Sequence, residues 1–331
     1  MPDRPEFPWP VGAATGIGSL PGTDIAEAQR LIFGELPDLP HLAELPARGP
    51  GADMIGRSAG LLADLPVQVY VGRWQVAPRP GRDLRTTADL RERDLDQLTE
   101  QGAGYAGTVK LQAAGPWTLA ASVDLPIGGR LLRDPGAVRD LGASLAEGLR
   151  RHVDEVRKRL PRARVLLQLD EPSLTAVLAG QVPTESGLSA YRAVDPADAA
   201  TALRGVIEAV GVPVVVHSCG PDVPLQVVRD SGAAAVSLDL SLLKDLDPLG
   251  EALEAGLGLF AGAFGLSDAP PTGKQVADRV ARLWKRLGFP AATLPAQVVV
   301  TPACGLAGAS PDFVRAALKA CREAGRRLVE A

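Results

Sequence analysis

The chain has 331 residues, of which 46% are hydrophobic and 22% are charged. These proportions are ordinary for a globular protein and exclude a disordered chain, which would bury too little apolar surface. The 36 glycines and 29 prolines exclude a coiled coil, because both residue types interrupt long helices. The formal net charge is −4 and no long basic run occurs, so we expect no nucleic-acid partner.

The chain shows no sign of export or membrane insertion. No apolar run reaches the roughly 18 residues that a membrane span needs. Residues 1–10 lack the apolar core of a secretory signal. The three cysteines are Cys219, Cys304 and Cys321, an odd and sparse set that argues against a disulfide framework. We therefore expect a cytoplasmic protein with reduced thiols and no membrane partner.

Short apolar runs recur along the chain and predict strands. In chain order they lie at residues 12–19, 41–45, 108–113, 165–170, 212–219, 235–240, 258–264 and 298–304. Most of them are rich in Val, Leu and Ile without alternation, which indicates burial on both faces, as in a parallel sheet. Residues 67–76, VQVYVGRWQV, predict a small hairpin inserted before the third of these strands.

Apolar residues at three- and four-residue spacing predict helices between the strands. The clearest run extends over residues 138–160, with Asp134 as the expected N-cap and Pro135 in the first turn. Residues 276–287 and 313–328 show the same pattern, and Ser310 caps the second. Eight strands alternating with helices predict a (β/α)8 TIM barrel forming a single domain over residues 1–331. An open Rossmann-like sheet is the runner-up, but no GxGxxG follows the first strand.

The carboxyl ends of barrel strands carry the catalytic residues in this fold class. Two of the predicted strands end in residues that bind metals, His217-Ser218-Cys219 and Pro302-Ala303-Cys304. His217 and Cys219 lie two residues apart in a strand, so both side chains point to one face. If the barrel closes, Cys304 can complete a His/Cys/Cys set with an open position, which is the pattern of a catalytic Zn²⁺ site. The alternative is that these are small buried residues at strand ends.

Other strand ends carry weaker signals. Asp239 could be an oxygen ligand, a group that holds His217 in place, or a solvated carboxylate. The pair Asp170-Glu171 could bind an ammonium group or act as acid and base, or it could be a helix cap. Residues 17–21 could hold a carboxylate through backbone N–H groups and a hydroxyl, or form a simple tight turn.

These motifs together resemble the catalytic domain of cobalamin-independent methionine synthase. The resemblance is carried, in order along nearly the whole chain, by Ile17-Gly18-Ser19-Leu20-Pro21, Gln168-Leu169-Asp170-Glu171-Pro172, His217-Ser218-Cys219 and Pro302-Ala303-Cys304-Gly305-Leu306. The wider superfamily includes corrinoid-dependent thiol methyltransferases and uroporphyrinogen decarboxylase, but the Asp-Glu-Pro motif favours the methionine synthase branch. The full-length enzymes carry an additional N-terminal barrel, so we expect this chain to be a stand-alone catalytic barrel.

The resemblance implies a role for each matching residue. His217, Cys219 and Cys304 match the zinc ligands, and Asp239 falls near the family's carboxylate ligand. The substrate residues that the resemblance implies are Ile17, Gly18 and Ser19 for the homocysteine carboxylate and Asp170 for its amino group. A further carboxylate is expected in the second loop, where Glu44 is a candidate, although spacing from Asp53-Met54 would select Arg48. Asp170 and Glu171 are the expected catalytic carboxylates.

Residues that the family uses for methylfolate have no counterparts here. Ser122 stands at the position of a Trp, Ala176 at that of a pterin-contacting Glu, and Ser267 near that of the acid His. We therefore expect a zinc-dependent methyltransferase that acts on a small-molecule thiol, most simply homocysteine, with a methylcorrinoid protein as a candidate donor. The alternatives are a zinc- or ligand-binding protein without turnover, and a decarboxylase of the uroporphyrinogen type. The decarboxylase would need several arginines near the N-terminus, and residues 17–21 offer none.

Overall fold

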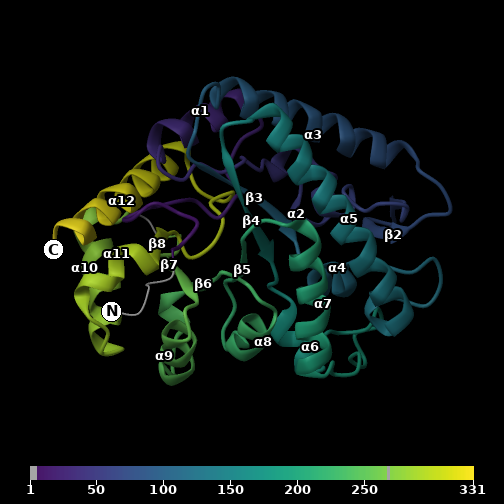
Figure 1. The fold of residues 1–331 in the computed structure, drawn as a ribbon. Helices are drawn as coiled ribbons and strands as arrows, with labels where there is room; N and C mark the ends of the chain where they lie inside the picture. The colour runs from purple at the N-terminus through teal and green to yellow at the C-terminus, as the bar shows by residue number, and fades with distance from the viewer. Residues whose placement is uncertain (1–5, 267–268) are drawn as a thin grey trace.

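The structure, a computed structural model, describes residues 6–266 and 269–331. Within these residues six parallel strands form one curled sheet in the order β3-β4-β5-β6-β7-β8 (Figure 1). The strands are β3 (Thr108–Ala114), β4 (Arg164–Asp170), β5 (Val214–Ser218), β6 (Ala235–Asp239), β7 (Gly258–Gly262) and β8 (Val298–Thr301). They coincide with the last six predicted strands, which are therefore confirmed apart from a few residues at their ends.

The first two predicted strands, residues 12–19 and 41–45, are irregular segments rather than strands. They join the sheet through isolated parallel bridges of Ala14 with Val300, Ser19 with Glu44, and His41 with Lys110. These contacts link the β8 edge to the β3 edge in a TIM-like arrangement, but the prediction of eight regular strands is confirmed for six. Glycines at 12, 16 and 18 and a proline at 40 explain the difference, because both residue types weaken a strand ladder.

The predicted hairpin is present. Strands β1 (Val67–Tyr70) and β2 (Arg73–Val76) pair in antiparallel register and form a separate two-stranded sheet. Asp124, two residues after the end of α4 (Pro116–Ser122), connects this hairpin to the main body, since its N–H donates to the Trp74 carbonyl and its carbonyl accepts from the Val76 N–H. The insertion thus lies against the main body of the protein.

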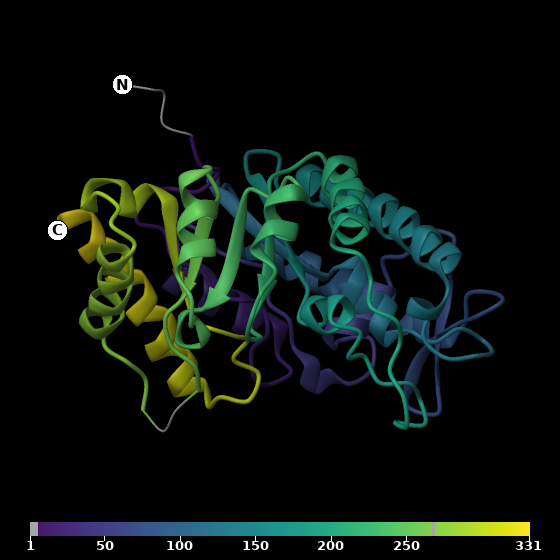
Figure 2. The same cartoon turned by 90° about the horizontal axis from the view of Figure 1, so that it is seen from below.

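The helices surround the sheet (Figures 1 and 2). They are α1 (Ile25–Glu35), α2 (Met54–Ala59), α3 (Arg82–Gln101), α4 (Pro116–Ser122), α5 (Pro135–Arg159), α6 (Leu174–Leu178), α7 (Pro196–Val210), α8 (Leu225–Asp230), α9 (Asp247–Glu254), α10 (Gly273–Arg286), α11 (Leu294–Gln297) and α12 (Pro311–Glu330). The predicted caps Asp134 and Ser310 each accept backbone N–H groups. Helix α10 begins three residues before its predicted start, because Thr272 and Gln275 form a capping box.

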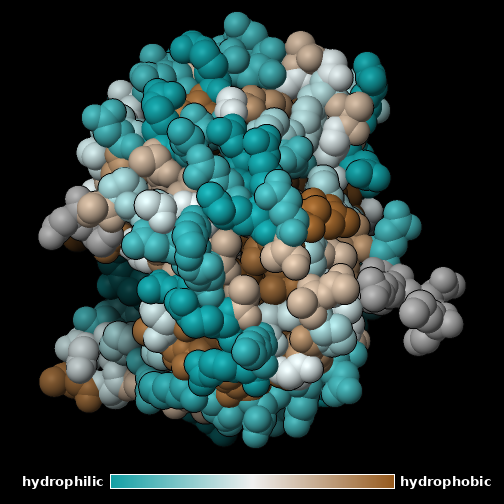
Figure 3. All heavy atoms as spheres, turned by 90° about the vertical axis from the view of Figure 1, so that its left-hand side faces the viewer, coloured by the Kyte–Doolittle hydropathy of each residue, from teal (hydrophilic) through white to brown (hydrophobic). Residues whose placement is uncertain are grey.

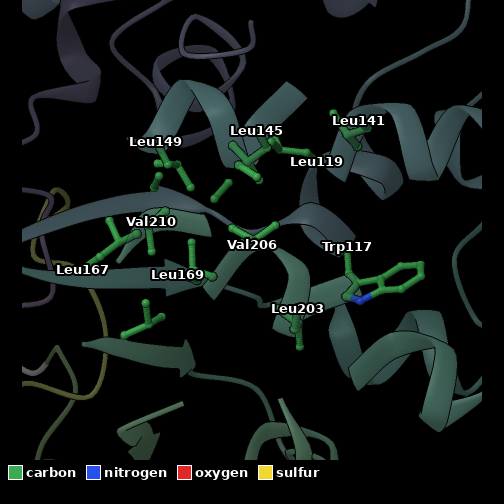
Figure 4. Packing of buried hydrophobic residues seen from close by; sticks show 14 of the residues in the cluster. Trp117, Leu119, Leu141, Leu145, Leu149, Leu167, Leu169, Leu203, Val206 and Val210 are labelled. Carbon is green, nitrogen blue, oxygen red and sulfur yellow. The ribbon is translucent and has the colours of Figure 1, made fainter. Parts of the chain in front are cut away.

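The outer layer of the core lies between the sheet and the helices. Figure 4 shows Leu145 and Leu149 of α5 and Val206 of α7 near Leu167 and Leu169 of β4, and all five belong to one buried cluster. Figure 3 shows the flank formed by the C-terminal helices, where hydrophilic side chains dominate and apolar ones gather in small patches. Within the residues that the structure describes, none of the helices has both the length and the apolar character of a membrane span.

The space inside the curled sheet changes from apolar to polar along the strands. Near the amino ends, the sheet encloses a small buried cluster that includes Leu166 of β4, Val215 of β5 and Ala235 of β6. Because alternate residues of a strand share a face, the residues two positions further along also point inward. On β4 and β5 these are Gln168 and His217, both buried. Gln168 and His217 therefore lie directly above a buried apolar cluster, which we call the apolar base of the site.

Candidate metal and substrate site

His217, Cys219 and Cys304 come together at the carboxyl end of the sheet. Their ligand atoms all lie within 4.8 Å of one another, and the sulfur atoms of the two cysteines are 3.2 Å apart. Strand β5 carries His217 near its end, and Cys219 follows two residues later. Cys304 follows β8 and is held by its neighbour Ala303, whose N–H donates to the Phe264 carbonyl over 2.7 Å. Residues 85 positions apart in the sequence thus form one donor set.

The imidazole of His217 is 4% exposed and has a fixed orientation. Its Nδ1 lies 2.9 Å from the hydroxyl of Ser237, which is its partner in the register between β5 and β6. This contact leaves Nε2 as the ring nitrogen that can bind a metal, because a ligating imidazole uses one nitrogen and its other nitrogen is held by a neighbour. The sequence alone assigned no role to Ser237. The signal that could have identified it is its position two residues before Asp239, which places both side chains on the same face of the strand.

The contact between the two sulfur atoms shifts the pKa values of the two thiols in opposite directions. Contact with Cys219 and then with His217 lowers the pKa of Cys304 to about 4. The same sulfur–sulfur contact, followed by burial, raises the pKa of Cys219. Thiolate is the form that binds metals, so the pair is prepared to bind a cation and would release the second proton on binding.

Asp239 lies outside this donor set. Its Oδ1 accepts from the N–H of Ser241 over 2.8 Å and from the hydroxyl of Ser241 over 2.6 Å. It begins a short 3₁₀ turn directly after β6. Among the described residues, the group of side chains close enough to share a metal ion consists of His217, Cys219 and Cys304, and it contains no carboxylate.

Two buried carboxylates, Glu44 and Asp170, lie beside the donor set. Burial raises the pKa of each. The charge of Asp170 raises the pKa of Glu44 further, whereas Arg57, 3.6 Å away, lowers it. The spacing alternative, Arg48, forms a two-armed ion pair with Asp94 instead, at 2.7 and 2.9 Å. Glu44 is therefore the residue of this segment on which the charge of Asp170 acts.

The segment Ile17-Gly18-Ser19 extends from the carboxylates to the donor set. A Cβ on Gly18 would lie 3.3 Å from the Glu44 carboxyl group. Ser19 is at the other end, where its hydroxyl would be 2.0 Å from a Cβ on Gly305, the residue after Cys304. The structure thus brings the first strand end, the carboxylates and the thiols into one region.

Glu171 is also fully buried, but it has different partners. Its carboxylate accepts from the N–H groups of Trp117 and Thr118 at 3.0 and 2.7 Å, and from the Thr118 hydroxyl at 2.7 Å. Burial raises the pKa of Glu171 to about 7, and the hydrogen bonds from Thr118 and Trp117 act in the opposite direction. These contacts make it a cap for the N-terminus of α4 rather than for the helix that follows it in sequence.

Three interior polar residues were not expected as site residues: Lys110, Gln112 and Gln168. All three are buried beneath the carboxylates, and burial lowers the pKa of Lys110 to about 7. Lys110 and Gln112 are two residues apart in an otherwise apolar strand, and this spacing could have been read as a polar inward face. Ser267, the position near the family's acid histidine, lies outside the described residues.

The curled parallel sheet, its surrounding helices and the thiol-containing site can be assigned to a class of protein when they are compared with known families. The family model described as "Cobalamin-independent synthase, Catalytic domain" matches residues 12–327. The fold, the site and this match define a methyltransferase enzyme. The chain belongs to the catalytic-domain family of cobalamin-independent methionine synthases, whose reaction is methyl transfer to homocysteine.

A solved structure shows the same fold at low sequence identity, and two further matches have TM-scores below 0.5. A B12-independent methionine synthase from Shewanella sp. W3-18-1, in complex with selenomethionine, is 14% identical with a TM-score of 0.63, covering 97% of this chain and 98% of that one. A tryptophan synthase chain from Pyrococcus furiosus is 11% identical with a TM-score of 0.43, covering 98% and 100%. A GH18 chitinase from Pseudoalteromonas aurantia is 10% identical with a TM-score of 0.41, covering 94% and 100%. Among curated proteins, no match was found.

The family match confirms the predicted family and the prediction of a methyltransferase. It also corrects one expectation. A methylcorrinoid protein was a candidate donor, but the family is cobalamin-independent, so a corrinoid partner is not supported. The alternatives of a binding protein without turnover and of a uroporphyrinogen-type decarboxylase are not favoured.

Proposed function

We propose that this protein methylates the thiol of homocysteine at a zinc ion bound by His217, Cys219 and Cys304. The observation that carries the proposal is the convergence of these three side chains, with all ligand atoms within 4.8 Å of one another. One imidazole and two thiols are the ligand types that zinc prefers, and three protein ligands leave a position for a substrate sulfur.

The residues present fit a zinc ion. Ser237 orients His217 with Nε2 directed to the site, and the lowered pKa of Cys304 provides a thiolate near neutral pH. Zinc, when bound, favours the deprotonated form of a coordinated thiol, and thiolate is the better nucleophile. The protein's own contribution is to hold the amino acid so that its sulfur faces the methyl group of the donor.

The amino acid end of the substrate would lie between Ser19 and the two carboxylates. An ammonium group placed between Glu44 and Asp170 would neutralise charge that is otherwise buried without enough partners. The Ser19 hydroxyl and the backbone N–H groups around Gly18 would bind the substrate carboxylate. In this arrangement Asp170 binds substrate, whereas Glu171 stabilises α4 and Asp239 caps a turn.

The first experiment measures zinc per chain in the purified protein and in two variants. We expect about one zinc ion in the wild-type protein and in the control variant Cys321→Ala, because Cys321 is buried in α12 and is not part of the donor set. We expect Cys304→Ser to lose most of its zinc. Full zinc retention by Cys304→Ser would show that the metal, if bound, is elsewhere.

The second experiment follows methionine formation from homocysteine. Methyltetrahydrofolate and a methylsulfonium, S-methylmethionine, serve as separate donors, because the residues that hold the pterin in the family are replaced here by Ser122 and Ala176. We expect methionine with one of these donors and loss of the product after treatment with a chelator. A zinc-loaded protein that makes no methionine from either donor would contradict the proposed reaction.

A further inference from the structure

Lys110 is a fully buried lysine inside the curled sheet, and the proposed reaction gives it no role. It lies on β3, where its register partner on β4 is Leu166, four residues before Asp170. Its Nζ donates to the carbonyl of Ile17 at 2.9 Å and to the amide oxygens of Gln168 and Gln112 at 2.7 and 3.2 Å. Burial lowers the pKa of Lys110 to about 7, while the charges of Asp170 and Glu44 raise it and favour the ammonium form, which has one N–H for each of these three oxygen acceptors.

The lysine determines how the two glutamine amides face. A charged lysine only donates, so each amide must turn its oxygen toward Nζ and its NH₂ group away. The NH₂ group of Gln168 then donates to Asp170 at 2.7 Å and to the Ile17 carbonyl at 3.0 Å. The NH₂ group of Gln112 donates to the Leu42 carbonyl at 2.8 Å and lies 3.5 Å from Glu44. The charge of Lys110 thus determines that the NH₂ group of Gln168 faces Asp170 and that the NH₂ group of Gln112 faces Glu44.

We propose that Lys110 is a positioning residue that, through the amides of Gln112 and Gln168, orients Glu44 and Asp170 to bind the ammonium group of the amino acid substrate. This inference rests on the proposed function. Lys110 does not touch the substrate. Its effect reaches the carboxylates through the two glutamines, and its charge also lowers the pKa of Glu44 and of Asp170.

The variant Lys110→Met keeps an unbranched side chain, one atom shorter, but removes its charge and its three donors. Both amides then lose the contact that selects their orientation, and an amide turned over places its oxygen against a carboxylate. Hydrogen bonds to charged groups are strong enough that we expect homocysteine affinity to fall about 10- to 100-fold. Affinity for 4-mercaptobutanoate, which is homocysteine without the amino group, should stay unchanged.

The test is calorimetric titration of the zinc-loaded protein with homocysteine and with 4-mercaptobutanoate. Wild type, Lys110→Met and the control Lys274→Met are compared, and zinc content is measured on the same samples. Lys274 is an exposed residue of α10 that pairs with Asp278. We expect wild type and Lys274→Met to prefer homocysteine, and Lys110→Met to lose that preference while retaining zinc and its affinity for the analogue. A merely structural role would weaken both thiols and the metal together.

Other outcomes separate this inference from the function on which it rests. If wild type prefers homocysteine and Lys110→Met keeps the whole preference, the role of Lys110 is wrong while the proposed substrate stands. If wild type shows no preference, the ammonium site is wrong, and the inference fails with it.

Should Lys110→Met not fold, the double variant Gln112→Met/Gln168→Met tests the same connection with the charge retained. We expect it to lose the preference for homocysteine. A double variant that keeps this preference would overturn the inference.

Discussion

Glu171 illustrates how a site residue predicted from a motif can have a structural partner instead. It directly follows Asp170 in the sequence, yet the two carboxylates lie in different surroundings. Asp170 accepts from Gln168 inside the sheet, and Glu171 accepts from the first turn of α4. An anion at the N-terminus of a helix is stabilised by the unpaired N–H groups and by the helix dipole.

The variant Glu171→Gln should therefore lose stability. Both oxygens of the Glu171 carboxylate accept hydrogen bonds, whereas an amide has only one accepting oxygen. At least one N–H group of Trp117 or Thr118 would therefore face the new NH₂ group. We expect the free energy of unfolding to fall by about 1–3 kcal/mol, measured by urea denaturation. Exposed Glu208→Gln on α7 is the control and should change stability by less than about 0.5 kcal/mol. Full stability combined with lost turnover would instead indicate a reacting carboxyl group.

The Ser237 hydroxyl gives a second prediction at this scale. Ser237→Ala removes the partner of His217 Nδ1, so the ring is no longer held with Nε2 toward the thiols. Zinc affinity, measured by competition with a chelator, should fall about 10- to 100-fold. Ser241→Ala is the matched control, because Ser241 contacts Asp239 rather than His217. An equal loss in Ser241→Ala would show that Asp239 contributes to the metal site after all.

At the scale of single elements, local sequence signals located α5 well. Its apolar stripe, its Asp134 cap and its proline in the first turn all lie within the helix or next to it, so no distant residue is needed to recognise them. The local sequence does not show what the helix packs against. The hydroxyl of Ser144 in α5 donates to the carbonyl of Ala63, which lies in the segment before the hairpin.

Two glycines of α5 should respond in opposite directions to alanine. A Cβ on Gly148 would be 1.8 Å from the Leu61 carbonyl oxygen, whereas a Cβ on Gly142 would meet nothing within 4 Å. Gly142→Ala should raise the free energy of unfolding by about 0.5–1 kcal/mol, because alanine is the better helix former. Gly148→Ala should lower it by about 1–3 kcal/mol through overpacking. Equal effects in a denaturation experiment would show that this helix is not in close contact with residue 61.

At the scale of the whole molecule, the site depends on how the sheet curls. The donor set combines the end of β5 with the segment after β8, and Ser19 connects to that segment through Leu306, whose N–H donates to the Ser19 carbonyl. The irregular first segment thus lies between the two edges of the sheet. Trp9 stabilises the opposite end, where its ring packs edge-on against Phe260 with the centroids 5.1 Å apart.

Trp9→Ala tests this arrangement. The indole is buried in the apolar cluster inside the sheet and donates to the Ala296 carbonyl. Its removal should lower the free energy of unfolding by about 3–5 kcal/mol, as measured by urea denaturation. Val11→Ala, a change in an exposed residue of the same segment, should cost less than about 0.5 kcal/mol. A loss below about 1 kcal/mol in Trp9→Ala would mean that this cluster contributes little to closing the base of the sheet.

The sequence by itself determined the six regular strands, three of the long helices, two of them with their caps, and the chemical types of the donor set. These features depend on residues within a few positions of one another, such as the uninterrupted apolar run before His217. Only the tertiary structure decided that residues 12–19 and 41–45 pair through single bridges, that Glu171 caps α4, and that Lys110 lies beneath the carboxylates. Each of these depends on contacts between residues far apart in the chain, and burial, rather than residue type, sets the energy of such contacts.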